Sequence, residues 1–274
     1  MRGRAGERTG VGGSVLGAGL LAGAANVIMQ LSHPGVGRGV VESRVDSGNL
    51  FKRPVKRTRT TVTYLAVALL GTDEERAAFR RAVNKQHAQV RSTERSPVRY
   101  NAFDPELQLW VAACLYKGVE DTNRIFGGVT DPDQLDELYR SSAVLGTTLQ
   151  VRPDMWPADR AEFERYWDKQ LAEVRIDDAV RELLHDVASL KFLPNPLSAV
   201  LGPVNAFLTT GFLPPKFREE MQLRWSDADQ ARFDRIIRVV AAVVNHIPLP
   251  MRGFPFNLAL WDLRKRMRRG MPLA

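Results

Sequence analysis

The chemistry open to this chain depends first on its four histidines, because it has only one cysteine. His87 follows Phe79 and Val83 at steps of four residues, so the three share one side of a predicted helix. An imidazole that points inward needs a hydrogen-bond partner or a metal ion. The spacing alone favours a core histidine bonded to a backbone carbonyl over a metal ligand. His33 precedes a proline, where it either caps the C-terminus of a helix or projects into a cavity.

The other candidates have simpler interpretations. His185 lies away from the apolar side of its predicted helix, which indicates exposure, and His246 ends another helix, where it can meet free carbonyls. Cys114 is the single cysteine, so an internal disulfide and a cysteine-based zinc site are excluded. A lone cysteine also suits a reducing compartment, and we expect a cytoplasmic protein. The motifs HExxH, GxSxG, CxxCH and a phosphate-binding glycine loop are absent, which argues against zinc proteases, serine hydrolases, covalently attached haem and nucleotide-binding enzymes.

The elements that position these residues are predicted to be helices. Thr72 to Glu75 forms a capping box, in which two side chains satisfy amides at a helix start. An apolar stripe at helical spacing follows each further start signal: Asp104-Pro105, Asp131-Pro132, Pro157, Asp177 or Asp178, and Ser226 to Asp229. We therefore predict an all-α fold, with a flexible basic N-terminus over residues 1–14 and one mostly helical domain over residues 15–274.

Some segments are harder to assign. Residues 15–32 are apolar and rich in small residues, which predicts a closely packed buried helix; the alternative is a signal peptide cleaved after the AGA at 22–24. The many glycines argue against a membrane span. Residues 193–215, with four prolines before Pro215, predict a loop or broken helix, and residues 248–256 predict an irregular crossing.

The net charge of +8 comes from three basic clusters: MRGRAGER at the start, KRPVKRTR at 52–59 and RKRMRR at 264–269. Such clusters attract nucleic acid or anionic lipid. No recognisable nucleic-acid motif accompanies them, so we favour a solvated basic face, expect no nucleic-acid partner and keep a peripheral membrane contact as an alternative.

Several stretches occur together in a characteristic order: MQLSHPGVGRGVVES at 29–43, KRTRTTVTYLAVALLGT at 56–72, VNKQHAQV at 83–90, YNAFDPELQLWVAACL at 100–115 and GFLPPKFREEMQLRWSDAD at 211–229. This ordered set, over roughly residues 20–245, resembles the catalytic domain of the rubber oxygenases (latex clearing proteins). The same family includes the fungal membrane-bound oxygenase of mycophenolic acid biosynthesis.

The resemblance implies an all-α domain enclosing a pocket for non-covalent haem b. His87, in His-Ala-Gln-Val, matches the family's axial iron ligand, and His33 is the next candidate for binding the cofactor. Arg57 and Thr61 match a pair that lies near the haem in this family. The resemblance implies that the pair orients dioxygen or the substrate. Alternatively, Arg57 pairs with a haem propionate. The two residues are one helical turn apart and so share a face. Glu42 lies near the position of the family's pocket glutamate, without a secure match.

The sequence departs from the family pattern at three positions. Thr60 replaces a lysine found in latex clearing proteins, Ala112 replaces a frequent histidine, and Ser92 replaces a glycine. From the resemblance we expect a haem b-dependent oxygenase or oxidase that acts with dioxygen on a hydrophobic, isoprenoid or lipid-like substrate. The departures at Thr60 and Ala112 argue against cleavage of polyisoprene itself. The alternative is a non-catalytic haem- or lipid-binding helical protein with a basic, membrane-facing surface.

Overall fold

A computed structural model describes residues 17–274, apart from the side chains of residues 249 and 250. Over this range the chain forms helices and no β-strand, and a single isolated bridge joins Arg91 to Asn101. The predicted all-α class and the single mostly helical domain are therefore confirmed. The predicted flexible segment 1–14 lies outside the described residues.

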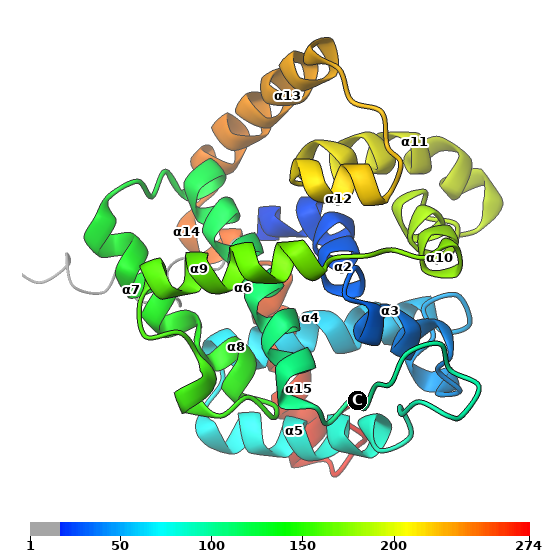
Figure 1. Cartoon of the computed structure of the whole chain (residues 1–274). Coiled ribbons are helices and arrows are strands. Elements are labelled where there is room, and N and C mark those ends of the chain that lie inside the picture. Colours follow the sequence, from blue (N-terminus) through cyan, green and yellow to red (C-terminus); the bar gives the residue numbers. More distant parts are fainter. Residues whose placement is uncertain (1–16) are drawn as a thin grey trace, which may run out of the picture.

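The centre of the molecule is built around α6 (Pro105–Gly127), which α9 (Arg160–Glu173) crosses in the view of Figure 1. Close to α6 lies α2 (Gly23–Leu31), which also contacts α10 (Asp178–Ala188) and α11 (Asn195–Phe212). Trp110 of α6 stacks on Trp167 of α9, with 5.3 Å between ring centroids. Most of the buried apolar side chains belong to this central cluster.

The helices that carry the candidate site pack beside this core. They are α3 (Pro34–Val41), α4 (Pro54–Leu70) and α5 (Asp73–His87), and α15 (Phe256–Arg268) packs along α4. A separate buried cluster joins α4, α5 and α15, and its members are Ala66, Val67, Phe79, Phe256, Leu260 and Leu263. This packing fixes α4 relative to α5, and therefore the side chains that the two helices present to each other.

Shorter helices and the long α13 complete the fold. They are η2 (Gly17–Ala22), η3 (Asp46–Gly48), α7 (Pro132–Ser142), α8 (Val144–Thr147), η4 (Pro153–Met155), α12 (Pro215–Glu220), α13 (Asp227–His246) and α14 (Leu249–Arg252). In Figure 1, α13 spans the upper left of the molecule and α11 the upper right. No helix among the described residues is long and apolar enough to cross a membrane.

Most of the predicted helix starts are confirmed. Both bonds of the Thr72–Glu75 capping box form, and Ser226 and Asp229 form a second one. The side chains of Asp104, Asp131 and Asp177 each accept a backbone amide at the start of α6, α7 and α10. These side chains satisfy amides that have no partner within the helix, which explains why the helices begin where they do.

Two helix predictions were wrong. The helix expected from Pro157 begins at Arg160, because Asp159 accepts the Glu162 amide and so acts as the N-cap. Most of the segment 193–215, expected as a loop or broken helix, is one continuous helix, α11, from Asn195 to Phe212. Its first two prolines lie at the helix start, where no N–H is needed, and only Pro203 lies inside the helix.

The N-terminal apolar run is helical from Gly17, the first described residue, but not as one regular buried α-helix. Residues 17–22 form the 3-10 helix η2, none of whose residues is buried. In α2, by contrast, Ala25, Ile28, Met29 and Leu31 are buried, as predicted for a core helix. The buried part of the predicted 15–32 helix is thus confined to α2.

The segment 248–256 is also more regular than predicted. It contains the short helix α14 and the first residue of α15, joined by a turn. Within it, the Arg252 side chain donates to the carbonyls of Asn245 and Ile247 at 2.7 and 2.8 Å. These bonds tie α14 to the end of α13, so the predicted irregular crossing is a compact corner.

Candidate functional site

Arg57 and Thr61 lie on α4 as predicted, one turn apart. The Thr61 hydroxyl donates to the Arg57 carbonyl at 3.1 Å, and the Arg57 guanidinium has no ion pair or side-chain hydrogen bond among the described residues. Arg57 is exposed, although desolvation by nearby protein atoms lowers its pKa. A guanidinium without a charged partner is available to bind an anionic group.

His87 is the last residue of α5 and faces the same region. Its side chain is half-buried, neither ring nitrogen has a hydrogen-bond partner among the described residues, and Nδ1 is fully buried. Burial, followed by the nearby positive charge of Arg57, lowers the pKa of His87 to about 4. The imidazole is therefore neutral at physiological pH, which is the form that ligates a metal ion.

Phe103 also packs against the imidazole, a contact that the sequence analysis did not predict. The rings of His87 and Phe103 meet edge to face, with 6.3 Å between centroids. Phe103 lies in the connection between α5 and α6, where no helical spacing relates it to His87. The only signal in the sequence is its place directly before the start of α6 at Asp104.

The position of His87 is set by contacts along α5. At the start of α5, the capping box fixes the first turn. Further along the helix, the Gln150 side chain accepts a hydrogen bond from Arg80 at 2.9 Å and donates one to Asn84 at 2.8 Å. Beside the histidine, Gln86 accepts a hydrogen bond from Ser47 at 2.8 Å. These hydrogen bonds hold the C-terminal half of α5 against η3 and against the connection between α8 and η4. The His87 imidazole is therefore pre-positioned.

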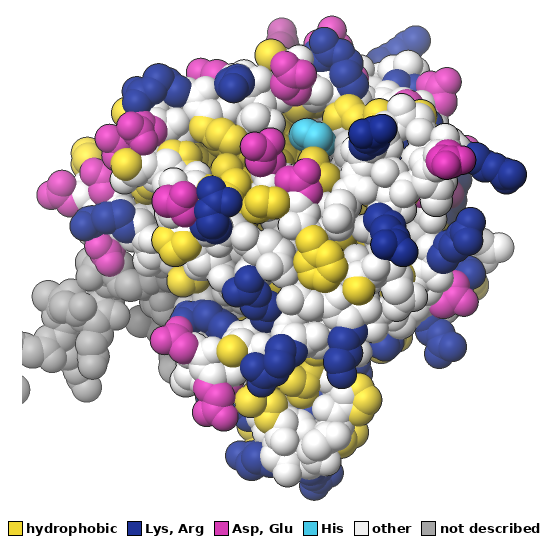
Figure 2. All heavy atoms as spheres, turned by 60° about the horizontal axis from the view of Figure 1, so that its bottom comes forward, with side chains coloured by type: hydrophobic (Ala, Val, Ile, Leu, Met, Phe, Trp, Pro, Cys, Tyr) yellow, Lys and Arg dark blue, Asp and Glu magenta, His cyan; other side chains and the backbone are white. Residues whose placement is uncertain are grey.

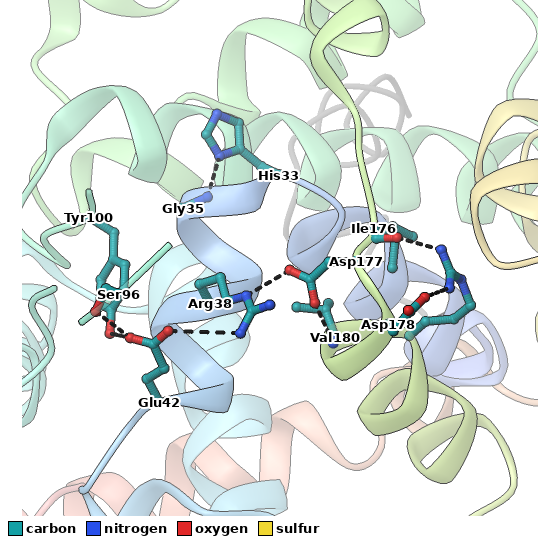
Figure 3. Close-up of polar contacts among 11 residues, drawn as sticks. His33, Gly35, Arg38, Glu42, Ser96, Tyr100, Ile176, Asp177, Asp178 and Val180 are labelled. Atoms are coloured by element: carbon teal, nitrogen blue, oxygen red, sulfur yellow. Dashed lines mark hydrogen bonds and ion pairs between the residues drawn. The ribbon is translucent and has the colours of Figure 1, made fainter. Parts of the chain in front are cut away.

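His33 has a different role from the one expected. It does not cap the C-terminus of α2; it is the N-cap of α3, where Nδ1 accepts the Gly35 amide at 3.2 Å (Figure 3). Burial lowers the pKa of His33, against the opposing effect of the Asp104 and Glu173 carboxylates. No described contact joins His33 to His87 or Arg57, and its ring instead lies against that of Trp110.

Glu42, near the expected position of a pocket base, is engaged elsewhere. Its carboxylate accepts hydrogen bonds from Ser96 at 2.5 Å and Tyr100 at 2.8 Å, and Arg38 lies 3.9 Å away (Figure 3). Arg38 also pairs with Asp177 at 2.7 Å. The network therefore connects α3 to the segment before α6 and to the start of α10, which is a structural role.

The remaining candidates do not converge on this region. His185 is half-buried rather than exposed, and His246 ends α13 with Nδ1 2.7 Å from the Ala242 carbonyl, as its position predicted. Ala112, at the position where the family often has histidine, is 1% exposed in the central core. Two surface pockets lie away from His87, one against η4 and the start of α9, the other between α5 and α8.

The part of the chain that the structure describes contains no group of three or more His, Cys, Asp or Glu arranged to hold a metal ion. A haem iron needs only one or two protein ligands, because the porphyrin supplies four nitrogens. Haem b also carries two carboxylates, for which an arginine without an ion pair is a suitable partner. An imidazole with a buried, unpartnered nitrogen beside an unpaired arginine fits such a group.

Comparison with known proteins identifies the family of this chain. Residues 11–242 match the family model described as "ER-bound oxygenase mpaB/B'/Rubber oxygenase, catalytic domain". Uncharacterised proteins of Mycobacterium bovis and Mycobacterium tuberculosis are each 55% identical over 247 residues, which is 90% of this chain and 97% of each relative. No solved structure matches. The chain belongs to the family of the ER-bound oxygenase mpaB/B' and rubber oxygenase catalytic domains.

Proposed function

We propose that this protein is a haem b-dependent oxygenase or oxidase with His87 as the iron ligand. The observation that carries the proposal is the state of His87: a neutral imidazole with no hydrogen bond, held at the end of a fixed helix beside an unpaired arginine. A buried polar atom without a partner is costly and usually marks a site completed by a ligand. When bound, haem b supplies the iron chemistry that activates dioxygen.

The residues of this chain would act by holding and orienting. His87 would bind the iron through one ring nitrogen. Arg57 would neutralise an anionic group near His87, either a haem propionate or a charge that develops on oxygen during the reaction. Thr61 would donate a hydrogen bond there only after its hydroxyl leaves the Arg57 carbonyl that it contacts now.

The proposed substrate class is a hydrophobic molecule, isoprenoid or lipid-like. The family description supports it, because rubber is a polyisoprene. Thr60 stands where latex clearing proteins have a lysine, and Ala112 is packed in the core instead of lining a site. These two differences support a substrate other than polyisoprene itself.

The first test concerns the cofactor. The full chain, expressed with haem available, should show a Soret band, and pyridine extraction should identify haem b. His87→Ala should lose most of the haem while far-ultraviolet circular dichroism stays unchanged. The matched control is His246→Ala, because His246 is exposed at the end of α13 and should keep the spectrum of the wild type.

Two results would contradict the proposal. A protein that acquires no haem under these conditions lacks the proposed cofactor. Full haem content and an unchanged spectrum in His87→Ala would place the ligand elsewhere, and His33→Ala would then be the next variant to examine.

A second function, a haem or lipid carrier without turnover, has one observation in its favour: the Thr61 hydroxyl is already engaged within α4. The two functions differ in oxygen consumption. An oxygenase loaded with haem and reductant should consume dioxygen faster when a hydrophobic substrate is added, whereas a carrier should bind that compound with no change in rate.

A further inference from the structure

The fold brings together two basic clusters that are far apart in the sequence. Arg59, in the second turn of α4, lies within electrostatic range of Asp262 and Arg266 of α15. The inner side of α15 packs against α4 through Leu260 and Leu263. The clusters at 52–59 and 264–269 therefore approach each other at Arg59 and Arg266.

Apolar side chains are exposed on the same two elements. Val55, in the first turn of α4, is 83% exposed, and Leu258 and Trp261, on the outer side of α15, are 51% and 54% exposed. The Lys265 ammonium lies over the Trp261 ring, 5.2 Å from its centroid. We call these α4 and α15 residues, with their cations, the basic–apolar face.

Many cations of the basic–apolar face have no acidic partner. Lys52, Arg264 and Arg266 pair with Asp46, Glu75 and Asp262, at 2.6 Å each. Among the described residues, the following cations of this face form no ion pair: Arg53, Lys56, Arg59, Lys265, Arg268 and Arg269. This excess of positive charge would be relieved by an anionic partner.

Helix stability does not explain the cations of α4. The N-terminus of a helix carries a partial positive charge, so acidic residues stabilise its first turn and basic residues oppose it. The first turn of α4 has no acidic residue and holds Lys56, directly after Lys52 and Arg53. Basic residues in this unfavourable place indicate a role in binding.

We propose that the basic–apolar face docks on the surface of an anionic lipid bilayer. Lys and Arg attract lipid phosphates, while Trp at the headgroup level and aliphatic side chains just below it add apolar burial. Figure 2, turned to bring the bottom of Figure 1 forward, shows Lys and Arg side chains across its lower half, with hydrophobic side chains between them. Nucleic acid is a weaker match, because exposed Val55 and Leu258 offer phosphates and bases no hydrogen bond.

A second exposed apolar surface provides a contrast. On α11, Leu197, Val200, Leu201 and Val204 form an exposed stripe at helical spacing, and residues 192–213 contain no charged residue. Binding through that stripe would depend little on lipid charge. Binding through the basic–apolar face should require anionic lipid and fall as salt screens the charges.

The test is flotation of the full chain with vesicles of phosphatidylcholine alone and of phosphatidylcholine mixed with phosphatidylglycerol. We expect binding to the anionic vesicles only. Each basic residue near such a surface contributes roughly fivefold in affinity, so the triple variant Lys265→Gln, Arg268→Gln, Arg269→Gln should bind on the order of a hundredfold more weakly. Trp261→Ser alone should also weaken binding.

The matched control removes three exposed cations from α13 and the turn before it, none of which forms an ion pair within residues 17–274: Arg224→Gln, Arg235→Gln, Arg238→Gln. It should bind the anionic vesicles within about twofold of the wild type, because these residues lie outside the face. Circular dichroism of each variant verifies the fold. Equal loss in both triple variants, or equal binding to neutral vesicles, would overturn the proposal. So would salt-sensitive binding of a single-stranded oligonucleotide without any vesicle binding.

Discussion

Within residues 17–274, the buried Nδ1 of His87 has no hydrogen-bond partner and the exposed guanidinium of Arg57 has no ion pair. They come from different helices, and the charge of Arg57 lowers the pKa of His87. A neutral imidazole near an unpaired guanidinium suits a ligand with both a metal centre and an anionic group. His33 and Glu42, by contrast, have hydrogen-bond partners within the chain and serve to hold α3 in place.

Arg57 is the residue whose replacement best tests the site. Arg57→Gln should either weaken haem retention, if the guanidinium pairs with a propionate, or lower oxygen consumption on the order of a hundredfold, if it stabilises developing charge. Arg59→Gln is the control, because it removes a cation two residues away on a different side of α4. Haem titration and an oxygen electrode measure the two quantities. Unchanged values in Arg57→Gln would mean that the residue has no part in the site.

At the scale of elements, α3 depends on close approach to its neighbours. A β-carbon at Gly37 would lie 2.4 Å from the Leu31 carbonyl and about 3 Å from both methyl carbons of Val180. No side chain fits there unless α3 moves away from α2 and α10. Because α3 carries His33 at its start and precedes Glu42, this contact sets the position of the whole network in Figure 3.

Gly37→Ala should therefore destabilise the protein by about 1–3 kcal/mol through overpacking. Gly23→Ala is the matched control, because a β-carbon at Gly23 meets nothing within 4 Å. That variant should be unchanged or more stable by up to about 1 kcal/mol, from the better helix propensity of alanine. Urea unfolding followed by circular dichroism compares the two. Equal free energies of unfolding for Gly37→Ala and Gly23→Ala would show that α3 adjusts freely.

At the scale of the whole molecule, α15 completes a core that begins near the N-terminus. The family match ends at residue 242, before α14 and α15, yet the buried side chains of α15 pack against α4 and Phe79 of α5. Arg264 adds an ion pair of 2.6 Å to Glu75 at the start of α5. The C-terminal helix thereby stabilises the two helices that carry Arg57 and His87.

Leu263, which is fully buried, and Leu258, which is half exposed, allow a matched comparison on α15. Leu263→Ala should cost about 2–5 kcal/mol, because it removes buried methyl groups and leaves a cavity. Leu258→Ala should change the free energy of unfolding by no more than about 0.5 kcal/mol. Thermal and urea unfolding both measure this difference. A similar small effect of both substitutions would mean that α15 contributes little to the fold.

Local signals in the sequence determined much of this protein. The capping box at Thr72 and the aspartates at 104, 131 and 177 mark helix starts correctly, because a cap acts on amides two or three residues away. The apolar stripes gave the all-α class for the same local reason. Helical spacing also placed Arg57 and Thr61 on one face and predicted that His87 follows Phe79 toward the interior.

Only the tertiary structure decided the contacts between elements. The sequence left His33 as a C-terminal cap or a cavity residue, but the chain turns at Pro34 so that His33 caps the start of α3. The proximity of Arg57 to His87, the contact of Phe103 with the imidazole and the meeting of the two basic clusters all depend on how distant apolar faces pack. Hydrophobic burial is non-directional, so a pattern shows which side of a helix is buried but not which partner buries it.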